Sequence, residues 1–185
     1  MTEREELMQL IRELSYEERE VTLASGRKSN FYFDGKQTTL NARGAVLTGR
    51  LFYEELKKFD GPVEGVGGPT MGADPIATAT AMVSSLAGDP IPAFIIRKEP
   101  KKHGTGQWVE GRKNLRQGAR VVIVEDVVTT GGSSLKAVEK AREEGLEVLG
   151  VIVLVDREEG GRETMEAQGV ALRAIFTKSE VVAGG

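Results

Sequence analysis

The chain has 185 residues, of which 39% are hydrophobic and 29% are charged, so it is long enough for one substantial core and has the composition of a soluble globular protein. The formal net charge of -3 provides no overall attraction to nucleic acid or to an anionic membrane. No cysteine is present, which excludes disulfides, thiolate zinc sites and cysteine nucleophiles, and a single histidine excludes a metal centre built from several histidines.

The N-terminal residues are charged and lead into no apolar run typical of a secretory signal, and no stretch has the length of a membrane span. No segment resembles a linker between domains. We therefore expect residues 1–185 to form a single cytoplasmic domain that binds neither nucleic acid nor membranes.

The predicted elements begin with an amphipathic helix over residues 2–14, where large aliphatic side chains recur at helical spacing. Residues 21–40 alternate glycines, hydroxyls and aromatics, which predicts extended segments around a turn outside the main sheet. A second helix is expected over residues 42–58, with Val46 among its buried positions, and Gly61 and Pro62 end it.

The remaining chain alternates apolar strands with helices. The expected strands cover residues 63–66, 92–96, 120–125, 146–155 and 170–176. The expected helices cover residues 73–86, 134–144 and 162–168. This alternation predicts the α/β class, with a central, mainly parallel sheet flanked by helices.

The most informative segment covers residues 121–134. Four β-branched residues in a row predict a strand that is covered on both faces, and Glu125 and Asp126 follow it. Ligands of parallel sheets bind at the carboxyl ends of the strands. The next residues, 129–133, combine hydroxyls with glycines at the start of a helix, which suits a phosphate monoester. The two carboxylates suit the vicinal hydroxyls of a ribose, so the segment predicts a site for a ribose 5-phosphate. An ordinary strand-to-helix turn is the plainer interpretation.

Three other features follow predicted strands. The glycine-rich turn over residues 67–72 offers backbone N–H groups to the other end of the same ligand, although on its own it is a weak signal. Residues 97–106 contain five basic or potentially basic side chains within seven residues, which predicts either a solvated loop or a cationic lid over a diphosphate. Arg157 suits a carboxylate ligand or a surface ion pair. We expect the aromatic residues 31–33 to lie in the core, and stacking on a flat base is the second interpretation.

Taken together, these residues resemble the type I phosphoribosyltransferases and, within them, the orotate phosphoribosyltransferases. The similarity runs through nearly the whole chain. The segment from Val122 to Ser133 is similar to the family's phosphoribosyl diphosphate loop, Arg97-Lys98 with Lys101 and His103 to its catalytic loop, and residues 25–29 to its N-terminal hood. The hood is expected mainly in residues 1–40.

The resemblance implies transfer of the phosphoribosyl group from 5-phosphoribosyl 1-diphosphate to orotate with Mg²⁺, giving orotidine 5′-phosphate and diphosphate in pyrimidine biosynthesis. It implies a homodimer in which the catalytic loop is shared between subunits. The residues implied in phosphoribosyl diphosphate binding are Arg97, Lys98, Lys101, His103, Glu125, Asp126, Val127, Val128, Thr129, Thr130, Gly131, Gly132 and Ser133. Asp126, Lys101 and His103 are the implied catalytic residues, and Thr129 and Arg157 the implied orotate contacts. No side chain is assigned as a metal ligand.

The chain departs from some family members at Ala24 and in the Thr70-Met71-Gly72 turn, where those members have lysine. Contacts from these two lysines are therefore not carried over. Two alternatives remain open: a phosphoribosyltransferase for another base, such as a purine, and a non-catalytic regulator that senses phosphoribosyl diphosphate.

Overall fold

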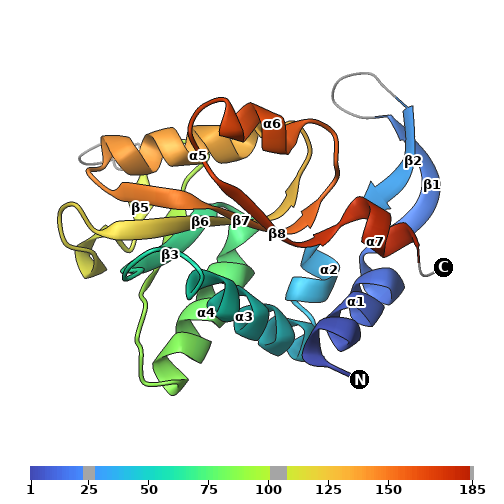
Figure 1. Ribbon diagram of the computed structural model, residues 1–185, viewed down its shortest axis with the longest axis horizontal. Helices are drawn as coiled ribbons and strands as arrows, with labels where there is room; N and C mark the ends of the chain where they lie inside the picture. The colour runs from blue at the N-terminus through green and yellow to red at the C-terminus, as the bar shows by residue number, and fades with distance from the viewer. Residues whose placement is uncertain (23–27, 101–107, 184–185) are drawn as a thin grey trace.

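The computed structural model describes residues 1–22, 28–100 and 108–183, and this part of the chain contains two β-sheets (Figure 1). The strands are β1 (Tyr16–Thr22), β2 (Lys28–Phe33), β3 (Gly65–Pro69), β4 (Ala93–Ile96), β5 (Val109–Glu110), β6 (Arg120–Val128), β7 (Glu147–Asp156) and β8 (Leu172–Thr177). The larger sheet has the order β5-β4-β3-β6-β7-β8, and all its neighbours are parallel except β5, which runs antiparallel to β4. The smaller sheet is the antiparallel pair β1–β2.

Helices cover both faces of the larger sheet, as Figure 1 shows. They are α1 (Glu3–Leu14), α2 (Lys36–Thr39), α3 (Ala42–Leu56), α4 (Ala73–Leu86), α5 (Gly132–Glu143), α6 (Gly161–Glu166) and α7 (Lys178–Val182), with a 3-10 turn, η1, over Arg112–Asn114. Helices α3 and α4 lie on one face, and α5 and α6 lie on the other. The predicted α/β class with a mainly parallel sheet is therefore confirmed. None of the helices in the described ranges is long and apolar enough to cross a membrane.

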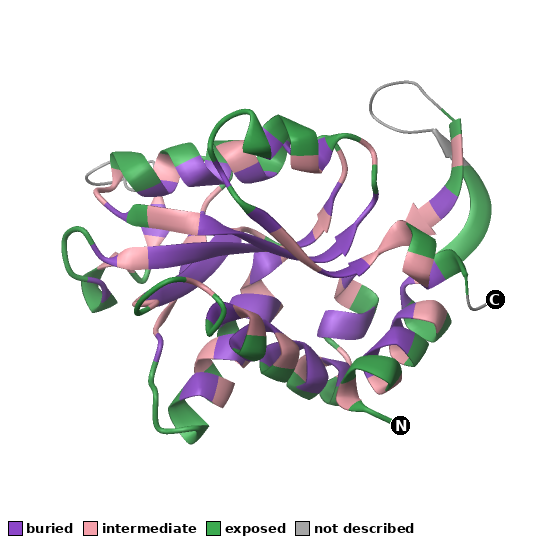
Figure 2. Cartoon of the chain, in the orientation of Figure 1, coloured by how far each residue is buried: buried purple, intermediate pink, exposed green. Residues whose placement is uncertain are grey.

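Strand β6 lies in the middle of the sheet and divides the core in two (Figure 2). Val122 and Val124 belong to the cluster that packs under α3 and α4, and Val121 and Ile123 belong to the cluster under α5. All four side chains are fully buried. Successive residues of a strand point to opposite faces, so an uninterrupted run of β-branched residues fills both layers.

The glycine-rich segment that we predicted as a turn over residues 67–72 is partly strand. Gly67 and Gly68 belong to β3 and pair with β4. Glycine is required at both positions because a Cβ atom there would collide with the backbone carbonyl oxygen of a neighbouring strand, that of Phe94 or that of Val124. The turn proper is Thr70-Met71-Gly72, and it contains a cis peptide bond between Thr70 and Met71.

Other predictions differ in detail. Val46 was expected to be buried but is 40% exposed, because α3 turns Leu47, Phe52 and Leu56 to the core and Val46 lies to one side of that face. Strand β6 runs three residues beyond the predicted end, so it contains Glu125 and Asp126 rather than ending at them. The short elements α2, β5 and α7 were not predicted.

The order of the strands indicates a ligand crevice at the carboxyl ends of two central strands. From β3 the chain crosses through α4 to β4 on one side, and from β6 it crosses through α5 to β7 on the other. The crossovers therefore diverge at the carboxyl ends of β3 and β6, where ligands of open α/β sheets bind.

Candidate active site

Asp126 lies at this crevice and is held between two glycines. It is 8% exposed. A Cβ atom at Gly35 would be 2.8 Å from the Asp126 Cβ, and a Cβ atom at Gly72 would collide with Asp126 Oδ1. Both glycines are needed for this close approach, and they fix the carboxyl group of Asp126 between the turn after β2 and the turn after β3.

The neighbouring carboxyl group, that of Glu125, points the other way. Ser133 Oγ donates to Glu125 Oε1 at 3.0 Å, and Ser134 Oγ donates to Oε2. Both serines belong to the first turn of α5. The two adjacent acids thus contact different elements, as the alternation of a strand requires.

Burial raises the pKa of both carboxyl groups. For Asp126, the positive charge of Lys36 opposes this rise in pKa, and the backbone N–H groups of Val127 and Asp126 oppose it further. For Glu125, the hydrogen bonds from Ser134 and Ser133 oppose the rise in pKa, and the charge of Asp126 adds to it. These are acids whose protonation states depend on their neighbours, as is typical of active sites.

The hydroxyl-rich turn after β6 forms a small concave site. Gly131 has a φ of +86°, which favours glycine, and from it the chain enters α5. A cavity of about 120 Å³ is lined by Glu125 and by residues 127–134. The arrangement of a turn, hydroxyl groups and the N-terminus of a helix of 12 residues favours an anion such as a phosphate group.

Arg157 follows the end of β7 and is buried, with 8% of its surface exposed, so it is not a surface ion-pair residue. Its Nη2 donates to the Phe31 carbonyl oxygen at 3.3 Å and to Ser29 Oγ at 3.4 Å, and its Nε donates to Glu159 Oε1 at 3.1 Å. The Arg157 N–H donates to the carbonyl oxygen of Val128 at 3.0 Å. Arg157 therefore lies beside the start of the hydroxyl-rich turn and joins it to β2.

Of the aromatic run of β2, Phe31 lies in the core, as we expected, and Phe33 packs against the core half-buried, whereas Tyr32 belongs to neither core cluster. The Phe31 side chain is buried, and its ring lies 5.1 Å from that of Tyr16 and 5.9 Å from that of Phe33. Residues 25–27 of the predicted hood motif lie outside the described residues.

Arg97 and Lys98 follow β4, and Arg97 is fixed by an ion pair in which Nη1 lies 2.8 Å from Glu110 Oε1. Both residues line a cavity of about 390 Å³ between β4 and α5. The other lining side chains include Thr70, Trp108, Ser133, Lys136 and Lys140. A cationic recess thus adjoins the turn after β6. Lys101 and His103 lie outside the described residues.

Sequence reasoning missed Lys36 and Asp34, whose side chains form an ion pair with 2.6 Å between Lys36 Nζ and Asp34 Oδ1. It also missed Ser134, although this serine follows the predicted turn directly. The signal for the first two was the Asp34-Gly35-Lys36 sequence after the aromatic run, because glycine allows close approach of the backbone to a site.

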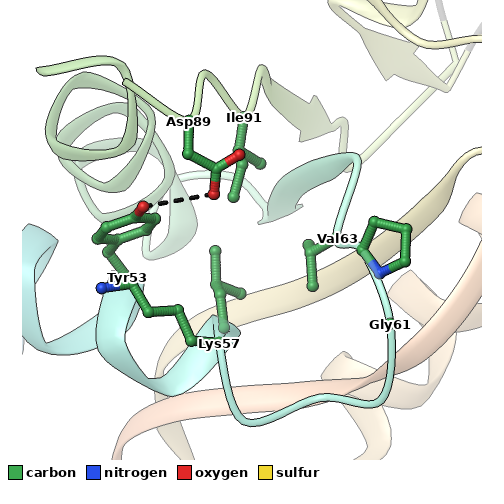
Figure 3. Close-up of a pocket in the computed structure, with 8 residues that line it drawn as sticks. Tyr53, Lys57, Gly61, Val63, Asp89 and Ile91 are labelled. Carbon is green, nitrogen blue, oxygen red and sulfur yellow. Dashed lines mark hydrogen bonds between the residues drawn. The ribbon is translucent and has the colours of Figure 1, made fainter. Parts of the chain in front are cut away.

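A cavity of about 140 Å³ lies elsewhere, between the end of α3 and the segment before β3 (Figure 3). Its polar side chains contact one another: the Tyr53 hydroxyl donates to Asp89 Oδ2 at 3.3 Å, and Lys57 Nζ lies 4.2 Å from the centre of the Tyr53 ring. None of the predicted site residues lines it.

Residues 37–168 match the phosphoribosyl transferase domain family. An orotate phosphoribosyltransferase of Bradyrhizobium diazoefficiens is 51% identical over 179 residues, which are 96% of this chain and 95% of that protein. The fold is similar to the crystal structure of the Mycobacterium tuberculosis H37Rv orotate phosphoribosyltransferase in complex with Fe(III) dicitrate, with a TM-score of 0.84. The two sequences are 41% identical, and the match covers 98% of this chain and 99% of that chain. The complex of the M. tuberculosis enzyme with 5-phospho-α-D-ribosyl 1-diphosphate is 39% identical, with a TM-score of 0.79 over 97% and 99% of the two chains. The predicted family is thus confirmed, and the chain belongs to the orotate phosphoribosyltransferases within the phosphoribosyltransferase family.

Proposed function

We propose that the chain binds 5-phosphoribosyl 1-diphosphate at the crevice between β3 and β6 and transfers its phosphoribosyl group to orotate. The products are orotidine 5′-phosphate, in the biosynthesis of pyrimidines, and diphosphate. The observation that carries this proposal is that β6 ends with a buried Asp126 next to Glu125, which lines the cavity of the hydroxyl-rich turn. The M. tuberculosis relative that binds this diphosphate supports the choice of donor.

The 5′-phosphate is assigned to the turn after β6. Backbone N–H groups and hydroxyls of residues 129–133 surround the cavity there, and α5 adds the partial positive charge of its N-terminus. Val127 and Val128 bring the strand to this cavity. Glu125 and Asp126 are assigned to the ribose, whose hydroxyl groups donate hydrogen bonds to carboxylate oxygens.

Orotate is assigned to the space between the turn and β2. Arg157 supplies a planar fork of N–H donors that suits the carboxylate of orotate, and Thr129 adds a hydroxyl and a backbone N–H. Arg157 and Thr129 lie close together because the Arg157 N–H bonds to the residue before Thr129. This carboxylate is also what separates orotate from purines and from uracil.

The diphosphate is assigned to the basic residues after β4. Arg97 and Lys98 line the recess next to Ser133, and they lead into the segment that contains Lys101 and His103. Four cationic or protonatable side chains would offset the charge of a departing diphosphate.

The reaction breaks the bond between ribose C1′ and the diphosphate oxygen and the N1–H bond of orotate, and it forms a bond from C1′ to N1. The N1 proton passes to the diphosphate or to water. Positive charge develops on the ribose as the diphosphate leaves. Asp126, when ionised, stabilises this charge electrostatically, and no covalent nucleophile is required. Lys101 and His103 are assigned to the leaving oxygens, where they balance charge or supply a proton.

We assign Mg²⁺ to the oxygens of the diphosphate and ribose, together with water. Both oxygens of Glu125 accept hydrogen bonds from serines, and the described residues contain no group of three or more acidic, histidine or cysteine side chains that would hold a cation. This donor set fits a Mg²⁺ that is bound mostly by its phosphorylated ligand. When bound there, Mg²⁺ neutralises the charge on the leaving diphosphate.

We also propose a homodimer that shares the loop after β4, a hood formed mainly by residues 1–40, and a cytoplasmic location. Exposed apolar side chains on α4 support the dimer: Met82 is 62% exposed, Leu86 is 87% exposed, and both line a shallow depression. The antiparallel pair β1–β2, which lies outside the larger sheet, supports the hood. Substrates that carry phosphate groups do not cross a bilayer unaided, which supports a location where they are made.

The test is the loss of orotate ultraviolet absorbance when the purified chain is mixed with orotate, 5-phosphoribosyl 1-diphosphate and Mg²⁺. Adenine, hypoxanthine and uracil are offered in parallel. We expect turnover with orotate alone. Turnover with a different base would contradict the role of Arg157, and binding of the diphosphate without turnover of any base would favour a regulator.

A further inference from the structure

The Asp34-Gly35-Lys36 segment presses against Asp126 although it comes from a different part of the chain. A Cβ atom at Gly35 would be 2.8 Å from Asp126 Cβ and 3.1 Å from Asp126 Oδ2. The backbone of this segment therefore packs on the Asp126 side chain with no room for a larger residue. Its two charged side chains flank the contact.

The position of Lys36 is fixed by Asp34. Lys36 Nζ lies 2.6 Å from Asp34 Oδ1, and the Lys36 N–H donates to the same oxygen at 3.3 Å. Asp34 Oδ2 accepts from Gln37 Nε2 at 3.1 Å, and the Asp34 N–H donates to the carbonyl oxygen of Ser15 at 2.9 Å. The cation is thus held at the start of α2 by an acid that is itself anchored to the end of α1.

The residues that follow Lys36 are hydrogen-bonded to the end of α1. Ser15 Oγ and Thr38 Oγ1 are 2.6 Å apart, both residues are buried, and the Thr38 N–H donates to Ser15 Oγ at 3.2 Å. Helix α2 is therefore tied to α1 below the site. A side chain on such a support keeps its geometry better than one on a free loop.

Three charged side chains act on Asp126: Lys36, Asp34 and Glu125. Burial raises the pKa of Asp126, Lys36 lowers it, and Asp34 raises it slightly. The pKa of Lys36 is itself raised, mainly by its hydrogen bond to Asp34 and also by the charge of Asp126, so Lys36 remains protonated at neutral pH. A neutral carboxyl group does not stabilise a developing cation, so the proposed reaction requires an ionised Asp126 in spite of its burial.

We propose that Lys36, held in place by Asp34 next to the Gly35 contact, is a positioning residue that keeps Asp126 ionised at the ribose site. This inference rests on the proposed function, because it assigns Lys36 a task only in a reaction that uses the charge of Asp126. The opposing interpretation is an ordinary, half-exposed ion pair between Lys36 and Asp34 that stabilises only the start of α2.

The test begins with the wild-type chain, which is assayed with orotate, 5-phosphoribosyl 1-diphosphate and Mg²⁺. A lack of turnover at this step contradicts the proposed function itself. With an active wild type, kcat/KM is measured between pH 5.5 and 9 for Lys36→Met, Lys36→Arg and Asp34→Asn. The matched control is Lys57→Met, which also removes a lysine from an ion pair but lies at the remote cavity of Figure 3.

Of the two members of the pair, only loss of the lysine should move the acid limb of the pH profile to higher pH. Lys36→Met removes a positive charge, so the acid limb should move to higher pH by about one unit, which is roughly a tenfold loss at pH values below the limb and a small loss on the plateau above it. Asp34→Asn removes a negative charge, so its acid limb should stay in place or move to lower pH. Lys36→Arg and Lys57→Met should both follow the wild type. The substrates titrate alike in every assay, so differences between variants report on the protein.

A purely structural ion pair gives a different result. Lys36→Met and Asp34→Asn would then lose activity equally at every pH, together with equal losses of thermal stability, and this would overturn the proposal. An unshifted acid limb in Lys36→Met would overturn it as well. Thermal unfolding is followed for each variant, and Lys36→Gln replaces Lys36→Met if the latter does not fold.

Discussion

Arg157 and Phe31 connect the central sheet to the two-stranded sheet. Arg157 Nη2 donates to the Phe31 carbonyl oxygen at 3.3 Å, and the guanidinium carbon lies 5.3 Å from the centre of the Phe31 ring. One side chain thus holds β2 and also lies where we place the carboxylate of orotate. The contact with β2 should contribute to stability, and the proposed contact with the carboxylate should contribute to the binding of orotate.

We expect Arg157→Gln to lower kcat/KM for orotate by about 10- to 100-fold, because two charge-assisted hydrogen bonds to a carboxylate are lost. The KM for 5-phosphoribosyl 1-diphosphate should change little. Unfolding in urea should show a loss of about 1–3 kcal/mol, since the bonds to Ser29 and Phe31 are lost too. Arg157→Lys should rescue little, because lysine lacks the planar fork.

The control for this variant is Arg173→Gln. Arg173 likewise combines an ion pair, at 3.1 Å to Glu55, with a ring contact, at 5.5 Å to Phe59, but it lies at the start of β8. It should alter stability without altering the KM for orotate. An Arg157→Gln variant with a normal KM for orotate would remove Arg157 from the base site.

Asp126→Asn should lower kcat by about 10²- to 10³-fold, because its charge is used in the transition state. In contrast to kcat, the stability of the variant should rise relative to that of the wild type as the pH increases. Burial raises the pKa of Asp126 in the folded chain, so the folded chain binds more protons here than the unfolded chain and stability falls as pH rises from the unfolded pKa through the folded one. Above this window the wild type keeps a buried charge that asparagine lacks.

The measurement is urea unfolding of the wild type and of Asp126→Asn at several values from pH 4 to pH 8. The free energy of unfolding of the variant, relative to the wild type, should increase toward pH 8. Asp89→Asn, which affects only the remote Tyr53 contact, serves as the control. A relative stability that declines with rising pH would show that Asp126 is better stabilised as an anion in the folded chain than in the unfolded one.

Gly72→Ala should impair the reaction more than the fold. Gly72 has a φ of -62° and a ψ of -40°, which alanine adopts freely, but the added Cβ would collide with Asp126 Oδ1. The carboxyl group must move, and we expect kcat to fall by about tenfold or more. Gly150→Ala is a matched control, since its Cβ would meet the Ala171 carbonyl oxygen at 2.9 Å in a crowded position of β7.

The comparison is of kcat and melting temperature for the two alanine variants. Gly150→Ala should lower the melting temperature with little effect on kcat. Gly72→Ala should lower kcat with little effect on the melting temperature. Equal effects of the two variants on kcat would mean that the position of Asp126 is not critical.

Met82→Glu should convert the proposed dimer to a monomer, because a charge would be placed in the apolar depression on α4. Sedimentation equilibrium measures the mass, and the assay at the same protein concentrations measures activity. Activity should fall with dissociation if the loop is shared between subunits. Val182→Glu, at another exposed apolar position, is the control. A wild type that is monomeric at micromolar concentration contradicts the dimer directly.

Sequence patterns predicted the long elements of this fold well. Helix α4 has the predicted bounds, and the parallel order follows from the alternation of strands and helices. Short elements escaped prediction because they depend on tertiary contacts: α2 is held by Asp34 and by Ser15, which is distant in sequence. The glycines of β3 resembled a turn because the reason for them, the close approach of neighbouring strands, is not visible in a local pattern.

The site was predictable in part. The acids and the turn after β6 were identified because their residues are contiguous. Lys36 was not, since it is brought near Asp126 only by the packing of the adjacent Gly35 on the Asp126 side chain. That Glu125 and Asp126 contact different elements follows from the strand period, but only once the strand is known to continue through them.

The continuation of β6 through its two acids makes the length of this strand a constraint on chemistry. Loss of one residue between Arg120 and Val124 would exchange the directions of Glu125 and Asp126, and it would also exchange the side chains that fill the two core layers. A change of length in β6 would therefore harm packing and catalysis in one step. We therefore expect variation in ligand contacts to arise in the loops that follow the strands rather than from changes in the length of β6.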